Sequence, residues 1–176
     1  MTHWPRTLPV LLALLAAVAV AAAAPAGQGG APPQGAWRTF EGSWSASGQR
    51  QLLPTGGERQ AATIQLSGAV ALTIGEGLSH GFRGEFIGLD DGASLSVGCA
   101  VWTDQHGDRI FSQLKGEPVR EGRRINGTVT GGTGRYAGFE GDYTFVWQYV
   151  VAGEGDTIQG RSVDLKGRVR VKEAGR

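Results

Sequence analysis

Cysteine is nearly absent from this sequence of 176 residues, in which Cys99 is the only one. A single cysteine cannot form a disulfide bond within the chain, so the stability of the fold has to come from packing and hydrogen bonding. The residues around Cys99 alternate as in a strand and put it on an apolar face. We therefore expect a small buried side chain rather than a nucleophile.

Metal ligands and a surplus of one charge are also missing. After residue 26 the only histidines are His80 and His106, which with one cysteine cannot make up a usual zinc site. Asp104 and Asp108 flank a turn, but two carboxylates fall short of the roughly six to eight oxygens that calcium takes. We predict no metal and no cofactor. Lys and Arg number 17 and Asp and Glu 16, so charge gives no reason to expect binding of nucleic acid or of an anionic membrane surface.

Helical periodicity is absent as well. After residue 37 no window combines a helical stripe of apolar residues with capping signals. The apolar residues recur instead at every second position, as in half-buried strands, and Tyr143, Phe145 and Trp147 share one face in this way. The pattern predicts strands at 38–47, 61–74, 80–89, 93–102, 109–117, 122–130, 139–151 and 157–171.

Eight short strands separated by turns can form an antiparallel sandwich or a closed barrel. The glycines favour the barrel. There are 30 of them, and several lie inside the expected strands, at positions 42, 68, 84, 88, 98, 127 and 160. In a flat sheet they would only weaken the strands, whereas a small barrel needs them where strands coil sharply. The sequence predicts an all-β fold, a single antiparallel, closed β-barrel of roughly eight strands over residues 37–172.

The first 26 residues differ from the rest of the chain. Arg6 precedes an uncharged, alanine-rich apolar run, which is the pattern of a secretory signal peptide. The alternative is an uncleaved membrane anchor, for which the run is short and weakly apolar. We predict a signal peptide over 1–26, a flexible linker over 27–36, a secreted or periplasmic protein, and no membrane association after cleavage.

The segment 131–147, GGTGRYAGFEGDYTFVW, begins with glycines spaced as in a nucleotide-binding loop. Such a loop needs a helix after the glycines, because the helix N-terminus holds the phosphates. The residues that follow here alternate as in a strand. We therefore predict that Gly131, Gly132 and Gly134 turn the chain and that the segment binds no nucleotide.

The longer stretch INGTVTGGTGRYAGFEGDYTF resembles the allene oxide cyclase-like barrel superfamily, which includes plant dirigent proteins, in its strand, Gly-Gly-Thr-Gly turn, aromatic residue and next strand. The close match covers about residues 123–147, and the number and size of the strands agree over 37–171. The resemblance implies an eight-stranded antiparallel barrel with an apolar cavity, often assembled as a trimer. It implies no activity, and none of the acidic and arginine pocket residues of the relatives is carried over to a position in this chain.

Five residues are candidates to line or rim a pocket if the polar face of their strand points into the barrel: Glu85, Trp102, Asp104, Arg109 and Tyr136. A carboxylate beside an arginine at an apolar mouth can orient a ligand or move a proton. The alternative is that the charged residues form outward-facing cross-strand pairs, each contributing well under about 1 kcal/mol.

Three functions fit such a barrel. It can bind a small hydrophobic molecule in its lumen, act as an isomerase-like or cyclase-like enzyme, or serve as a structural, oligomer-forming envelope protein filled by its own side chains. The aromatic residues discriminate between them. Phe145, Trp147 and Tyr149 favour binding if they face an open lumen, and assembly if they pack outward against another subunit. Ligand binding is the leading prediction.

Overall fold

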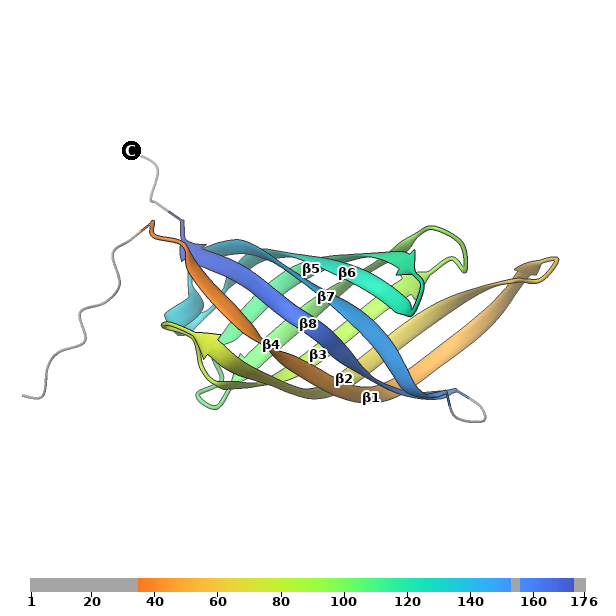
Figure 1. Ribbon diagram of the computed structural model, residues 1–176, viewed down its shortest axis with the longest axis horizontal. Helices are drawn as coiled ribbons and strands as arrows, with labels where there is room; N and C mark the ends of the chain where they lie inside the picture. The colour runs from red at the N-terminus through yellow and green to blue at the C-terminus, as the bar shows by residue number, and fades with distance from the viewer. Residues whose placement is uncertain (1–34, 153–155, 173–176) are drawn as a thin grey trace, which may run out of the picture. The chain divides into compact units, whose positions relative to one another are not determined.

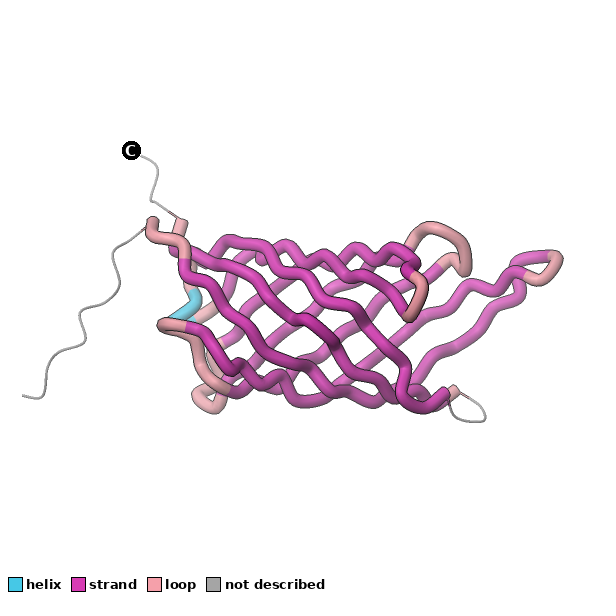
Figure 2. Tube along the Cα trace, viewed as in Figure 1, coloured by secondary structure: helices cyan, strands magenta, loops and turns pink. Residues whose placement is uncertain are grey.

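The computed structural model describes residues 35–152 and 156–172, which form one closed, eight-stranded antiparallel β-barrel (Figures 1 and 2). The predicted fold class is therefore confirmed. The only helical element in the described part of the chain is the short 3-10 segment η1, Gly134–Tyr136. The strands are β1 (Arg38–Gly56), β2 (Arg59–Gly75), β3 (Gly81–Asp90), β4 (Ser96–Asp104), β5 (Arg109–Val119), β6 (Gly122–Gly132), β7 (Phe139–Ala152) and β8 (Thr157–Val171).

Each strand pairs with the next one along the chain, and β8 pairs with β1 to close the barrel. The barrel therefore has two different ends. One end, which we call the terminal end, carries the start of β1, the end of β8 and the connections 76–80, 105–108 and 133–138. The opposite end, which we call the mouth, carries the connections 57–58, 91–95 and 120–121.

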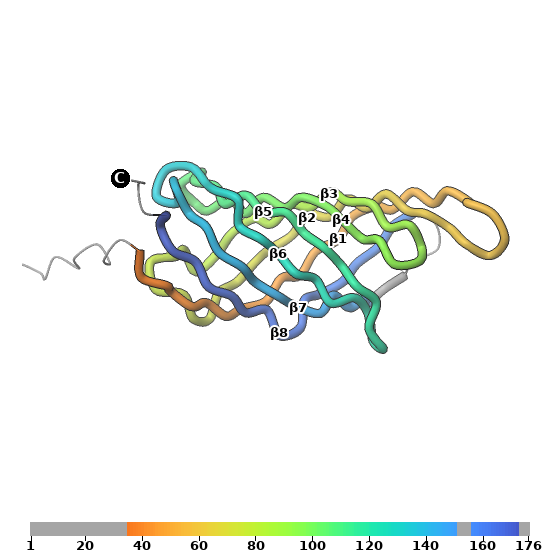
Figure 3. Tube along the Cα trace, turned by 90° about the horizontal axis from the view of Figure 1, so that it is seen from above, coloured from red at the N-terminus to blue at the C-terminus, as the bar shows by residue number. Residues whose placement is uncertain are grey.

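The first hairpin is longer than the sequence pattern predicted, because β1 runs to Gly56 rather than to residue 47. Pairing of β1 with β8 ends at Gln49, and pairing of β2 with β3 begins at Ala62. The residues between form a two-stranded extension that projects past the mouth (Figures 1 and 3). Its side chains are mostly exposed on both faces, so no alternation of apolar and polar residues marks it as a strand.

The lumen is filled by stacked aromatic side chains. Adjacent rings lie 5.0 Å apart for Trp44 and Trp147 and 5.0 Å apart for Trp102 and Tyr143, measured between ring centroids. The rings of Tyr143 and Phe145, with centroids 6.3 Å apart, connect these two pairs of rings. We call the set the aromatic column. It consists of Phe40, Trp44, Phe82, Trp102, Tyr136, Phe139, Tyr143, Phe145 and Trp147, all at most 5% exposed.

Glycines on neighbouring strands make room for these rings. Tyr143 pairs with Gly127 on β6 and with Gly167 on β8, and a Cβ atom at either glycine would clash with the Tyr143 side chain. A Cβ atom at Gly160 would lie 2.5 Å from Cζ2 of Trp147. The strand glycines thus provide space for large inward side chains, in addition to allowing the barrel to coil.

One prediction about the direction in which a side chain points is wrong. Cys99 is exposed rather than buried, because the inward positions of β4 are Ala100 and Trp102. The apolar residues Val97 and Cys99 on β4 instead face outward, opposite Leu89 and Ile87 on β3. Both faces of β4 are apolar in the sequence, so alternation alone could not tell which face the lumen takes.

The predicted signal peptide, residues 1–26, and most of the predicted linker, residues 27–36, lie outside the described residues. Within residues 35–152 and 156–172, no helix has the length and apolar character needed to cross a membrane.

The packing of glycine against the column can be tested with Gly160→Ala. The added methyl group meets the Trp147 ring and the Gln148 carbonyl oxygen at 2.6 Å, so we expect the free energy of unfolding to fall by about 1–3 kcal/mol. Denaturant unfolding measures the change. The matched control is Gly81→Ala, since nothing lies within 4 Å of its Cβ position, and a change within about 0.5 kcal/mol is expected there. Equal changes in the free energy of unfolding at the two positions would contradict the conclusion that Gly160 makes room for the Trp147 ring.

Candidate functional site

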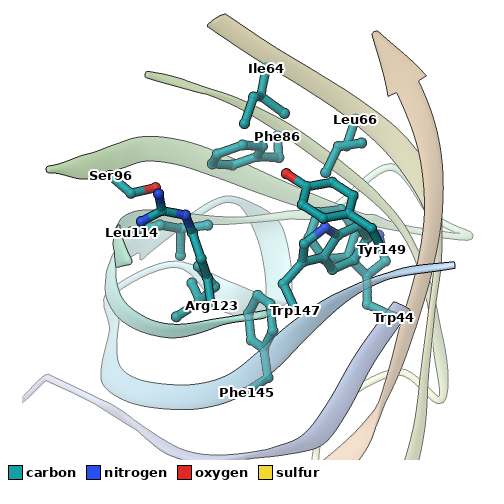
Figure 4. A pocket seen from close by; sticks show the side chains of 11 residues that line it. Trp44, Ile64, Leu66, Phe86, Ser96, Leu114, Arg123, Phe145, Trp147 and Tyr149 are labelled. Carbon is teal, nitrogen blue, oxygen red and sulfur yellow. The ribbon is translucent and has the colours of Figure 1, made fainter. Parts of the chain in front are cut away.

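A small cavity of about 40 Å³ opens at the mouth of the barrel (Figure 4). Its position follows from the column, which ends at Trp44, Phe145 and Trp147 and leaves the last part of the lumen unfilled. Apolar side chains from six strands line it, together with a few polar groups. The apolar lining includes Ile64, Leu66, Phe86, Leu114 and Ile125.

Arg123 is the charged residue of this cavity. It lies at the start of β6, and its Nη2 atom is 2.6 Å and 2.8 Å from the two carboxylate oxygens of Asp90 at the end of β3. The side chains are only 21% and 11% exposed, so the ion pair is largely removed from solvent. Asp90 also accepts the backbone N–H of Gly92. A buried, hydrogen-bonded pair of this kind fixes the position of both groups.

Tyr149 lines the cavity from β7, two residues beyond the last position, Trp147, at which β7 pairs with β6. Its ring meets Trp147 edge-on at 6.3 Å. Partial burial of the side chain raises the pKa of Tyr149, and the Asp90 carboxylate raises this pKa further. The phenol is therefore neutral at physiological pH and can serve as a hydrogen-bond donor or acceptor at the mouth.

Three of the five residues singled out in the sequence meet at the other end of the barrel. Trp102 contacts Phe82 at 5.9 Å, and Phe82 contacts Tyr136 at 5.8 Å, measured between ring centroids. The Tyr136 hydroxyl donates a 2.9 Å hydrogen bond to Asp104. The structure thus brings Trp102, Asp104 and Tyr136 together, but at the terminal end, and none of them lines the mouth cavity.

The bonds of Asp104 explain this arrangement. Its carboxylate accepts the backbone N–H groups of His106 at 2.8 Å and Asp108 at 3.0 Å, and it faces Nε of Arg135 at 3.5 Å. The Tyr136 hydroxyl also accepts the backbone N–H of Ser79 at 3.4 Å. We call this network the Asp104–Tyr136 lock. It joins the three connections of the terminal end.

The charge states within the lock fit a structural role. Burial alone would raise the pKa of Asp104, but the hydrogen bonds from His106, Tyr136 and Asp108 outweigh it and lower the pKa below the usual 3.8. Burial and the bond to Asp104 raise the pKa of Tyr136 to about 12. Near neutral pH the carboxylate stays ionised and the phenol stays protonated, so neither group is poised to exchange a proton.

The remaining two candidates face solvent. Glu85 is on the outer face of β3, where its carboxylate lies 2.8 Å from Nη2 of Arg83, and both side chains are exposed. Arg109 is exposed at the start of β5. The arginine that approaches Asp104 is Arg135 from η1 instead.

The glycine-rich segment after β6 turns the chain toward β7. Gly134 has a φ of +52°, which a residue with a side chain rarely adopts, and Gly131 has a φ of +151°. The backbone N–H of Arg135 donates to the Asp108 carboxylate at 3.2 Å. An acidic side chain of the protein therefore lies where a loop of this kind would bind an anion.

Sequence reasoning missed Arg123 and Asp90, although a signal was present. Counting by twos from Ile125 places Arg123 on the inward face of β6, and counting from Phe86 places Asp90 on the inward face of β3. Charged residues on an inward face mark a strand end that opens to solvent or a polar contact inside the barrel.

Comparisons with models of protein families and with curated proteins find no match for this chain. The functional argument therefore depends on the site itself. No cluster of three or more His, Cys, Asp or Glu side chains that could hold a metal ion occurs in the described part of the chain.

Tyr136→Phe tests the lock. The variant removes a hydrogen bond to a buried carboxylate, so we expect the free energy of unfolding at pH 7 to fall by about 2 kcal/mol. Denaturant unfolding by circular dichroism measures it. Tyr149→Phe is the control. Because Tyr149 is 42% exposed, we expect this variant to change the free energy of unfolding little.

The Asp104–Tyr136 lock also predicts how the free energy of unfolding depends on pH. Because the pKa of Asp104 is lowered in the folded state, its contribution to stability is complete above pH 3.8 and is lost as the pH falls below that value. Asp104→Asn should therefore flatten the slope of unfolding free energy against pH between about pH 4 and pH 2. An unchanged slope would show that the carboxylate is not stabilised by folding.

Proposed function

We propose that this protein binds a small, mainly apolar molecule at the mouth of the barrel. The observation that carries the proposal is the mouth cavity, which combines an apolar wall, a floor of aromatic rings and one buried ion pair. Ligand pockets commonly pair an apolar lining with a few fixed polar groups. Phe145 and Trp147 point inward and line this cavity, which argues against assembly through these two residues.

The size of the cavity limits how a ligand enters. Pockets for whole drug-sized ligands measure about 300–1,000 Å³, whereas this cavity has about 40 Å³. The aromatic column closes the lumen below Trp44 and Trp147. A ligand therefore places one ring or one chain end in the cavity and lies with the rest against Tyr149 and the mouth.

We also propose an allene oxide cyclase-like relationship and export from the cell. The closed eight-stranded barrel is compatible with the first, and the apolar run after Arg6 motivates the second. A catalytic role is less well supported, because the acid in contact with a phenol, Asp104, is held in the lock.

Uptake of N-phenyl-1-naphthylamine, a neutral probe that fluoresces in apolar sites, tests the proposed function. We expect saturable fluorescence with the wild-type protein and at least a fivefold weaker affinity in Ile64→Trp, because the larger side chain fills the cavity. Ile74→Trp is the matched control, since Ile74 is 52% exposed near the opposite end of β2. No saturable uptake, or equal loss in both variants, would contradict binding at the mouth.

Assembly remains a second candidate because of one feature of the outer surface. Ile87 and Leu89 are 63% and 44% exposed, and with Val97 and Cys99 they form an apolar face on β3 and β4. Contiguous exposed apolar side chains often mark contacts between proteins. Native mass spectrometry tests this candidate. An oligomer that Ile87→Glu converts to monomer would support it, and a wild-type monomer at about 50 µM would exclude it.

A further inference from the structure

Two buried hydrogen-bond donors at the mouth have no partner among the described residues, Nη1 of Arg123 and Nε of Arg50. The indole Nε1 atoms of Trp44 and Trp147 are also without a partner there, but they lie against other strands: Nε1 of Trp44 is beside Gly84 on β3, and the Nε1 edge of the Trp147 ring is over Gly160 on β8. An unsatisfied buried polar group costs about 1–3 kcal/mol, so native proteins rarely keep several at one place. The two guanidinium donors at the end of the lumen that the column leaves unfilled indicate a site for something that accepts hydrogen bonds.

The guanidinium group and the indole rings lie on opposite sides of the cavity. Arg123 on β6 is directly opposite Trp147 on β7 in the sheet, but the Trp147 ring leans over Gly160 on β8 and lies 5.0 Å from the Trp44 ring on β1. Figure 4 shows the Arg123 guanidinium at one side of the cavity, near Ser96, and the two indole rings together across from it. A ligand head group bound to Arg123 therefore lies on the Ser96 side, and the indole rings provide part of the apolar wall.

The chemistry of these side chains restricts the ligand group. Arginine and tryptophan side chains donate hydrogen bonds and accept none. A ligand hydroxyl or amine would bring its own proton into a site that already holds donors, whereas a carboxylate brings only acceptor oxygens.

The charges at the mouth favour an anion. Asp90 contacts only Nη2 of Arg123, which leaves Nη1 free of protein partners among the described residues. Arg50, opposite the cavity residue Ile64, adds a second guanidinium. The nearby Asp91 carboxylate is exposed and accepts the backbone N–H groups of Ala93 and Leu95, within its own turn.

We propose that the ligand is an amphiphilic carboxylic acid, with its carboxylate on Nη1 of Arg123 and its apolar chain or ring against the apolar wall. This inference rests on the proposed function, since it names the class of molecule that the mouth cavity takes. Arg123 is then the residue that selects an acid over a neutral molecule of the same shape.

Decanoate and decanol are the probes for this inference, because they share an apolar chain and differ in the head group. Displacement of N-phenyl-1-naphthylamine and isothermal titration at pH 7.5 in 150 mM NaCl give both affinities. We expect decanoate to bind at least tenfold more tightly than decanol to the full chain. Decyl phosphate, measured in parallel, separates a carboxylate site from a general oxyanion site.

Two variants locate the selectivity. Arg123→Met should reduce the preference for decanoate over decanol to less than threefold, and Arg83→Met, which changes an exposed arginine, should leave the preference intact. Since Arg123→Met leaves Asp90 without its partner, the double variant Arg123→Met with Asp90→Asn, which removes both charges of the pair, provides a second test. It should likewise reduce the preference for decanoate to less than threefold and leave the affinity for decanol within twofold of wild type.

The outcomes separate the two proposals. If decanol binds as tightly as decanoate, or if the preference for decanoate survives in the double variant, the carboxylate inference is overturned while apolar binding at the mouth stands. If decyl phosphate binds and decanoate does not, the ligand class is a phosphate ester and the inference is again overturned. If no probe binds, the proposed function itself fails.

Discussion

The fit between aromatic rings and glycines inside the barrel is the constraint on which the rest of this structure depends. Eight strands enclose an interior just wide enough for side chains to fill. Tyr143 can point inward only because Gly127 and Gly167 on the two neighbouring strands have no side chain, and Trp147 depends on Gly160 in the same way. Ring and gap together fix the register of the strands that meet there.

The column also makes the two ends of the barrel different. At the terminal end the rings continue to Phe139 and Tyr136, and the Asp104–Tyr136 lock ties the connections over them. At the mouth the rings stop at Trp44 and Trp147, and the strands continue past them. One end is therefore closed by hydrogen-bonded turns, and the other keeps a cavity with unpaired donors among its described residues.

Both ends contain a buried carboxylate, but with different surroundings. Asp104 accepts hydrogen bonds from two backbone N–H groups and a phenol, so its partners are complete. Asp90 holds Arg123 through one nitrogen and leaves the second nitrogen to the cavity. The difference explains why the acid that stood out in the sequence is structural, and why the acid that did not stand out belongs to the candidate binding site.

The sequence by itself determined the all-β class, the number of strands and most of their positions, because period-two alternation and glycine-rich turns are local signals. It also placed Tyr143, Phe145 and Trp147 on one face. Only the tertiary structure decided which face of β4 is inward, how far the first hairpin extends, and which charges meet. Arg123 and Asp90 are 33 residues apart in the chain and come together only when the barrel closes. Contacts of that kind depend on strand register and curvature, which no local pattern records.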